Sequence, residues 1–340
     1  TVLRNLPLQQ QGKIGFGKRG EFVDAHVVPR DFVSTVEGKH VNLKDNRTAF
    51  IVLALINSSV FQAIINLYCG QHKYPGYVGI FPTPDIFSKD AMARAGACAE
   101  RIYSMLDSFE CSDETSPKFD CSGAESILDE GFTEKATKAC EQIRELEHQL
   151  NHFIEQAFDL TESERASVSE RCRNVPGVGG QADEPSSEAV ASAKISYSLG
   201  ATFGRWDIRY ATGECQPPQL PAPFDPLPVC PPGMLQNADG LPAAKEDVPD
   251  DYPLSITWPG ILVSDPGHSE DIVTRIDNTL REIWPKDWES IKRDVCDVLG
   301  ASGLRKYFTE GNSGSRFFSD HLKRYNKSRR QAPIYWPLST

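Results

Sequence analysis

The most regular hydrophobic pattern in the chain lies between Phe132 and about Ser169. Apolar side chains recur there at alternating spacings of three and four, at Ile143, Leu146, Leu150, Phe153, Ala157 and Leu160. This heptad spacing puts all six on one face of a helix. Because the seam is too short for a free coiled coil, we expect it to pack on a second helix. The Ala-, Met- and Leu-rich residues 91–109 predict that helix.

Shorter patterns predict the elements before and after this pair. The first forty or so residues, rich in Gly, Val and Phe, indicate short strands and turns. The apolar stretch Ala49–Leu67 predicts a buried helix. Residues Gly70–Pro84 are expected to form a loop that ends in a short strand. Residues Ser196–Tyr210 are expected to be strand-like or turn-rich.

The second half of the chain is divided by proline. Residues 217–259 hold twelve of the 24 prolines and therefore predict little regular helix or central strand. A helix is expected after Ser264 or Asp265, either of which would cap it. Its buried face is expected to carry Ile272, Ile276, Leu280 and Ile283. A further short helix is predicted over Asp287–Leu299.

These elements together predict an α+β fold with four consecutive parts. Residues 1–120 would form a module of mixed strands and helices, and residues 121–172 a helical spacer that contains the heptad seam. Residues 173–260 would be a flexible, Pro-rich linker region with the strand-like segment 196–210. Residues 261–340 would be a helical distal region that ends in a basic, aromatic tail.

Composition narrows the class of protein. The chain has 340 residues, of which 39% are apolar and 24% charged, values typical of globular proteins. No apolar run approaches the roughly 20 residues of a membrane helix. Nine scattered cysteines without a Cys-x-x-Cys pair argue against a zinc ribbon or a disulfide scaffold, and they favour reduced thiols in the cytoplasm.

Three motifs that suggest catalysis or metal binding have simpler explanations. The Gly15–Glu21 stretch GFGKRGE has the glycine spacing of a dinucleotide site but lacks the following helix signal and the later ribose-binding acid. It also lacks the Lys-Ser/Thr of a P-loop, so a turn that presents Lys18 and Arg19 is favoured. His148 and His152 are four apart but lack the Glu of a zinc-protease helix, and we expect an exposed helix face. DPGH (Asp265–His268) reads as a turn. We therefore predict no catalytic, metal-binding or cofactor-binding residue in this chain.

The distribution of charge gives the strongest functional signal. The formal net charge is −11, yet residues 316–330 carry six cations against one acid, Asp320. The six are Arg316, Lys323, Arg324, Lys327, Arg329 and Arg330. If this segment is helical, Lys323, Lys327 and Arg330 share one face. A concentrated basic face between aromatic residues is how an acidic protein binds DNA phosphates.

A second basic stretch, FGRWDIR (Phe203–Arg209), supports two interpretations equally. As a strand it would place Arg205, Asp207 and Arg209 on one face and Trp206 and Ile208 on the buried face. The structural interpretation is an internal Arg–Asp pair. The functional interpretation is a pair of guanidinium groups directed at phosphate or guanine.

Several segments resemble adenine-specific DNA methyltransferases. FIVLALINSSVFQAIINL, GYVGIFPTP and EQIRELEHQLNHFIEQAFDLTESE resemble the target-recognition domain and helical spacer of type IIG restriction–modification enzymes. KIGFGKRGEFVDAHVVPRDFV, YSLGATFGRWDIR, ILVSDPGHSEDIV and FFSDHLKRYNKSRRQAPIYWPLST are similar to the carboxy-terminal half of the methyltransferases of BREX and DISARM phage-defence systems. The resemblance covers most of the chain.

The resemblance implies methyl transfer from S-adenosylmethionine to adenine N6 in double-stranded DNA. The Gly-rich cofactor motif and the Asp/Asn-Pro-Pro-aromatic loop are missing here, so we expect the chain to be the recognition and spacer portion of a larger parent. The partners would be duplex DNA, an upstream catalytic domain and other defence subunits, with no membrane. The predicted DNA contacts are Lys18, Arg19, Arg205, Arg209, Arg316, Lys323, Arg324, Lys327, Arg329 and Arg330.

Two alternatives stay open at this point. A protein-interaction scaffold within a defence complex would use the heptad helix and the basic tail to dock other subunits. An independent small-molecule enzyme would need a cleft lined by titratable groups, and the sequence offers no such constellation.

Overall fold

The computed structural model describes residues 12–325 except 18, 34–37, 43–44, 84–88, 123–125, 181–183 and 312–314. These residues form two compact units, each assembled from separate segments of the chain. The first unit contains the described residues within Thr1–Asp107, Thr137–Asp183 and Pro221–Leu227. The second contains those within Ser108–Ala136, Glu184–Leu220 and Pro228–Thr340. The division into recognition module, spacer and distal region stays a prediction.

The first unit begins with a small antiparallel sheet in the order β2-β1-β3. The strands are β1 (Lys13–Gly17), β2 (Ala25–Val28) and β3 (Gly38–Asn42), as the Gly- and Val-rich start of the sequence predicts. Ile14 pairs with Val27 on one side and with Val41 on the other. With the helices, the sheet confirms the predicted α+β fold.

The predicted helix over Ala49–Leu67 is two helices, α2 (Asn46–Asn57) and α3 (Ser59–Tyr68), with a 61° bend between them. Ser58 ends the first helix and caps the second, because its hydroxyl accepts a hydrogen bond from Phe61 N at 3.2 Å. Within the described residues, only this bent pair has the combined length and apolarity of a membrane span, and no single helix does. The expected short strand near Pro84 is wrong, since Pro75–Gly79 forms helix α4 instead.

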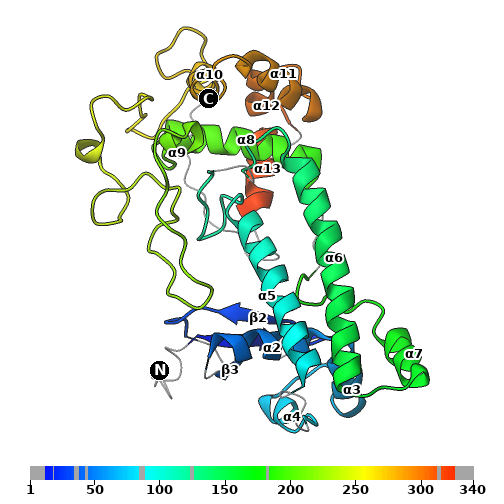
Figure 1. The fold of residues 1–340 in the computed structure, drawn as a ribbon. Helices are drawn as coiled ribbons and strands as arrows, with labels where there is room; N and C mark the ends of the chain where they lie inside the picture. Colours follow the sequence, from blue (N-terminus) through cyan, green and yellow to red (C-terminus); the bar gives the residue numbers. More distant parts are fainter. Residues whose placement is uncertain are drawn as a thin grey trace. The chain divides into compact units, whose positions relative to one another are not determined.

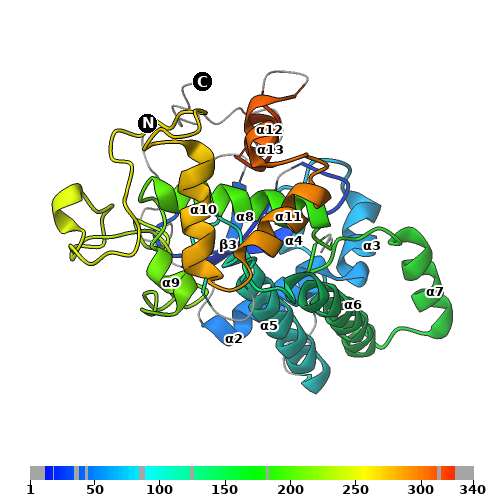
Figure 2. The same cartoon turned by 90° about the horizontal axis from the view of Figure 1, so that it is seen from above.

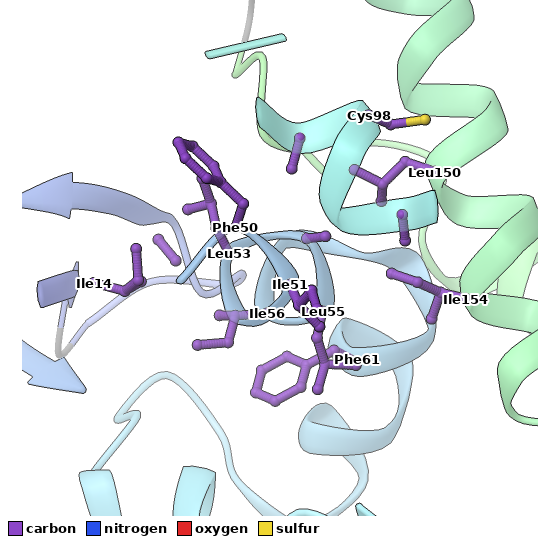
Figure 3. Packing of buried hydrophobic residues seen from close by; sticks show 14 of the residues in the cluster. Ile14, Phe50, Ile51, Leu53, Leu55, Ile56, Phe61, Cys98, Leu150 and Ile154 are labelled. Carbon is purple, nitrogen blue, oxygen red and sulfur yellow. The ribbon is translucent and has the colours of Figure 1, made fainter. Parts of the chain in front are cut away.

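The long helices of the first unit confirm the periodicity argument. Helices α5 (Asp90–Glu110) and α6 (Phe132–Ala157) run side by side in Figures 1 and 2. Four of the six predicted seam residues are buried: Ile143, Leu146, Leu150 and Ala157. Figure 3 shows Leu150 and Ile154 of α6 to the right of the apolar residues of α2, with Cys98 of α5 next to Leu150. Helix α7 (Glu162–Arg171) follows after a Thr161–Glu164 capping box.

The second unit is built around helix α8 (Ser187–Thr202), which packs against α10 (Ile272–Ile283), α11 (Trp288–Val298) and α13 (Arg316–Tyr325). Of the strand-like or turn-rich structure expected over Ser196–Tyr210, the strand is therefore wrong, and a turn is present only between Thr202 and Ile208. Almost the whole second half of α8 is buried, so its sequence lacks the one-sided apolar period by which a surface helix is recognised. A turn then leads to the short helix α9 (Ile208–Thr212).

The Pro-rich region, α10 and α11 agree with the sequence, apart from the cap of α10 and Ile283, which is only half-buried. The Pro-rich region contains only the short 3₁₀ helix η2 (Lys245–Asp247) and isolated bridges within the described residues. Asp271, rather than Ser264 or Asp265, caps α10 by accepting from Thr274 N at 3.1 Å. Helix α12 (Leu304–Thr309) precedes α13.

Candidate anion-binding groove on helix α13

Helix α13 is anchored to the second unit through its aromatic face. Phe317 is buried and packs on Phe308 with ring centroids 4.8 Å apart. His321, one turn later, is also buried and stacks on Phe317. Because these residues hold one side of the helix inward, Arg316 and Lys323 on its other side lie at the surface.

A surface groove of about 530 Å³ lies between α13 and the first turns of α8. Helix α13 contributes Arg316, Asp320, Lys323 and Arg324, and the α8 side contributes Ser186, Glu188, Ala189 and Ser192. Ser186 is the amino-terminal cap of α8, so the positive end of that helix dipole adjoins the groove. The lining thus brings together three of the predicted DNA-binding cations.

Two of these cations remain available to a ligand. The Lys323 side chain is 76% exposed, and its nearest acid, Asp320, lies at 3.6 Å. Asp320 also accepts a hydrogen bond from Tyr307 Oη at 3.0 Å, which directs part of its charge away from the groove. Arg316 is exposed at the start of α13, where a positive charge opposes the helix dipole. Helix stability therefore does not account for an arginine at that position.

Arg324 instead turns inward. Its Nε lies 3.2 Å from Oε1 of Glu114, and its Nη2 donates to Ser192 Oγ at 2.7 Å and to the Ala189 carbonyl at 3.2 Å. Only 16% of the Arg324 side chain and 1% of the Glu114 side chain are exposed. These contacts fix α13 against α8, so Arg324 positions the groove wall.

A buried polar network lies beneath α13. The Ser196 hydroxyl donates to Glu114 Oε1, and Ser196 Oγ lies 3.1 Å from Nδ1 of His321. Burial lowers the pKa of His321 to about 4, with the cations Arg324 and Arg205 adding to the effect. Burial raises the pKa of Glu114, and Arg324 and the Ser196 hydroxyl offset only part of that rise.

This network does not have the arrangement of a catalytic triad. In a triad the histidine lies between the nucleophile and the acid, whereas here the serine lies between the two other groups. All three residues are at most 2% exposed, so a substrate has no access to the hydroxyl. The network supports the packing of α13 rather than a reaction.

The two arginines of FGRWDIR also make internal contacts. Arg209 forms a two-point ion pair with Asp207, at 2.9 and 2.7 Å, and this raises the Arg209 pKa. Of the two interpretations of FGRWDIR, the internal Arg–Asp pair is the one that the structure shows, on a helix start instead of a strand. The Arg205 guanidinium lies 4.5 Å from the Trp206 ring centroid and 5.3 Å from that of Tyr325. It stacks between rings, as guanidinium groups do.

The other predicted contacts are divided between exposed and undescribed residues. Arg19 is exposed in the first unit, where its backbone pairs with that of His72. Lys18, Lys327, Arg329 and Arg330 lie outside the described residues. The expected turn at Asp265–His268 is present, with His268 N bonded to the Asp265 carbonyl at 3.1 Å.

Sequence reasoning missed Glu114 and Ser196. Glu114 lies in a stretch that reads only as the end of a helix, and its partners are 82 and 210 positions away, so no local signal identifies it. No group of three or more His, Cys, Asp or Glu residues suited to a metal occurs in the part of the chain that the structure describes. Neither the protein-family models nor the curated proteins that were searched contain a match to this chain.

Proposed function

We propose that the chain is the DNA-recognition portion of a site-specific, S-adenosylmethionine-dependent adenine-N6 DNA methyltransferase that acts in the cytoplasm in phage defence or restriction–modification. The observation that carries the proposal is the α13 groove, where Arg316 and Lys323 project beside the amino terminus of α8. Cations beside a helix amino terminus are groups that bind phosphate oxygens, and the acids Glu188 and Asp320 line the same groove. The motifs that resemble the methyltransferase family supply the reaction class.

Within this proposal the groove binds the DNA backbone and sets its register, while an upstream domain binds S-adenosylmethionine and transfers the methyl group. Contacts to phosphate carry no sequence information by themselves. Arg205 and Arg209 serve the packing of the second unit, because their guanidinium groups already bind Trp206, Tyr325 and Asp207. The contacts that matter most are then those of Arg316 and Lys323.

The test is duplex binding across a salt series, measured by fluorescence anisotropy with a labelled duplex. The variant Arg316→Glu/Lys323→Glu should bind much more weakly, and its affinity should fall less steeply with salt, by about one to two in logarithmic slope. Arg324 is left unchanged, because its substitution would disturb the packing of α13. A matched control is Lys286→Glu/Arg293→Glu, which makes the same change in charge at two exposed positions of the second unit.

If the wild type binds the duplex and both double variants bind it equally tightly, the role of the groove is contradicted. A folded chain that binds no duplex even at low salt would contradict the function itself. The protein-interaction scaffold would then lead, and it is favoured independently by the exposed apolar side chains of Leu67, Tyr68 and Ile80. Salt-insensitive binding to a protein partner would support it.

A further inference from the structure

A cluster of exposed aromatic rings lies at the end of α3 and the start of α4 in the first unit. Tyr68, Tyr74 and Tyr77 are 38%, 44% and 38% exposed, and His72 is exposed beside them. Exposed aromatic side chains that lie together, rather than singly, are typical of a contact surface. We call these four residues the aromatic cluster.

The rings of the aromatic cluster are ordered by contacts with one another. Tyr77 lies edge-on to both Tyr68 and Tyr74, with ring centroids 6.3 and 6.0 Å apart. The Tyr68 hydroxyl donates to the Tyr77 carbonyl at 3.2 Å. His72 and Tyr74 have nearly parallel planes, 15° apart. The cluster therefore presents flat faces in fixed orientations before any ligand binds.

Positive charge adjoins the cluster. Arg19 and His72 are partners in an antiparallel bridge, which is held by the Gly20 N–H bond to the Gln71 carbonyl at 3.0 Å. Partners in such a bridge place their side chains on the same face. The exposed Arg19 guanidinium therefore extends on the side of the His72 ring.

Negative charge is absent from the segment that forms the cluster. Residues 67–83 contain no Asp or Glu, in a chain that has 47 of them. The segment therefore adds no negative charge beside the rings, and the exposed Glu21 lies two residues after Arg19. An anionic ligand with flat faces is a nucleic acid strand whose bases are unpaired.

We infer that the aromatic cluster and Arg19 bind unpaired nucleobases of single-stranded DNA, with the rings stacking on the bases and Arg19 contacting the backbone. Single-stranded DNA has the same backbone as the duplex of the proposed function. The aromatic cluster belongs to the first unit and the α13 groove to the second, so either proposal can be contradicted without the other. Stacking of this kind tolerates any base sequence, because every base has a flat face.

The experiment uses the full chain and a fluorescently labelled oligothymidine, with binding followed by anisotropy at one fixed salt concentration. The variant Tyr74→Ala/Tyr77→Ala should bind at least about tenfold more weakly. Tyr74→Phe/Tyr77→Phe keeps both rings and should bind within about twofold of the wild type. Trp258→Ala removes an exposed aromatic ring of the second unit and should have no effect. Thermal melting of each variant checks that it is folded.

A second probe separates stacking from charge. An abasic oligonucleotide of the same length keeps its phosphates but offers no base to stack on, so the wild type should bind it at least about tenfold more weakly than oligothymidine. Equal affinity for the two strands would overturn the inference, as would an alanine variant that binds like the wild type. A wild-type chain that binds no oligothymidine would also overturn it and leave the cluster to a protein partner.

The two proposals fail in different ways. If the Arg316→Glu/Lys323→Glu variant loses duplex binding but oligothymidine binding still depends on Tyr74 and Tyr77, both stand. If the duplex is never bound while the tyrosine effect persists, the proposed function falls and the inference stands. If duplex binding behaves as expected and the tyrosine variants bind oligothymidine normally, only the inference falls.

Discussion

Arg324 and Glu114 form an ion pair in the interior of the second unit, with Nε and Oε1 3.2 Å apart. The two residues are 210 positions apart in the chain, and the pair connects the last described helix to the turn after α5. A cation that the sequence assigns to DNA therefore has a structural partner. We therefore expect a substitution of Arg324 to lower folding stability before it affects DNA affinity.

The Arg324→Met variant should lose about 3 kcal/mol of unfolding free energy, because it leaves the Glu114 carboxylate buried without its cation. Urea denaturation followed by circular dichroism measures the loss. Adding Glu114→Gln to this variant should restore part of it, since the isolated charge is then removed. Lys323→Met, on the exposed neighbour, should change stability by no more than about 0.5 kcal/mol. A loss of equal size in both single variants would contradict the assignment.

The buried His321 predicts a dependence of stability on pH. Its pKa is about 4 in the folded state against an ordinary value of 6.5, so the unfolded state takes up the proton first as the pH falls. Folding stability should therefore decrease from about pH 6.5 down to about pH 4. The shift corresponds to about 3 kcal/mol in total.

The charged groups that face His321 require a comparison of variants. Arg324 and Arg205 stay cationic throughout, but Glu114 has a raised pKa and so contributes the opposite trend, with stability lost as the pH rises through its folded value. Urea titrations of the wild type and of His321→Asn between pH 4 and 7 isolate the histidine. The stability difference between them should shrink or reverse toward pH 4. Parallel pH curves would show that His321 does not titrate as predicted.

Gly200 of α8 is required by the indole of Trp206. A Cβ at this position would lie 2.4 Å from Cδ1 of Trp206, whose indole is fully buried. Gly200→Ala should therefore cost about 1–3 kcal/mol in stability, although alanine is the better helix former. Gly79→Ala meets no atom within 4 Å and should lie within about 1 kcal/mol of the wild type. Near-ultraviolet circular dichroism should show a changed tryptophan signal only in the first variant.

The Gln62 side chain connects α3 to the strand region. Its Oε1 accepts from Val23 N at 2.9 Å, and its Nε2 donates to the carbonyls of Val23 and Ile56 at 2.7 and 2.8 Å. Gln62→Leu should cost about 3 kcal/mol or more, because it leaves these buried backbone groups without partners. Gln149→Leu, on the exposed surface of α6, should cost no more than about 0.5 kcal/mol. Similar losses in the two variants would contradict the role of the amide.

The contrast between α6 and α8 shows which features the sequence reveals. Helix α6 has one buried face, so the spacing of Ile143, Leu146 and Leu150 predicts the helix. The second half of α8 is buried on all sides, and its mixture of Ala, Ser and single apolar residues carries no period to detect. The basic residues show the same limit of prediction from sequence. The sequence locates Arg316, Lys323 and Arg324, but the inward turn of Arg324 depends on a carboxylate that only the folded chain brings near.

The bend between α2 and α3 determines how the sheet is aligned with these helices. Asn57 bonds both backbone groups of Ala25, at 3.0 and 2.9 Å, and Gln62 bonds both backbone groups of Val23. Each amide thus makes the pair of backbone hydrogen bonds that a residue of a neighbouring antiparallel strand would make. Val23 and Ala25 are two positions apart and therefore face the same side. A shift of this segment by one residue would break all four bonds and turn its apolar side chains outward. The side-chain amides of Asn57 and Gln62 therefore permit only one register of the hairpin against the two helices.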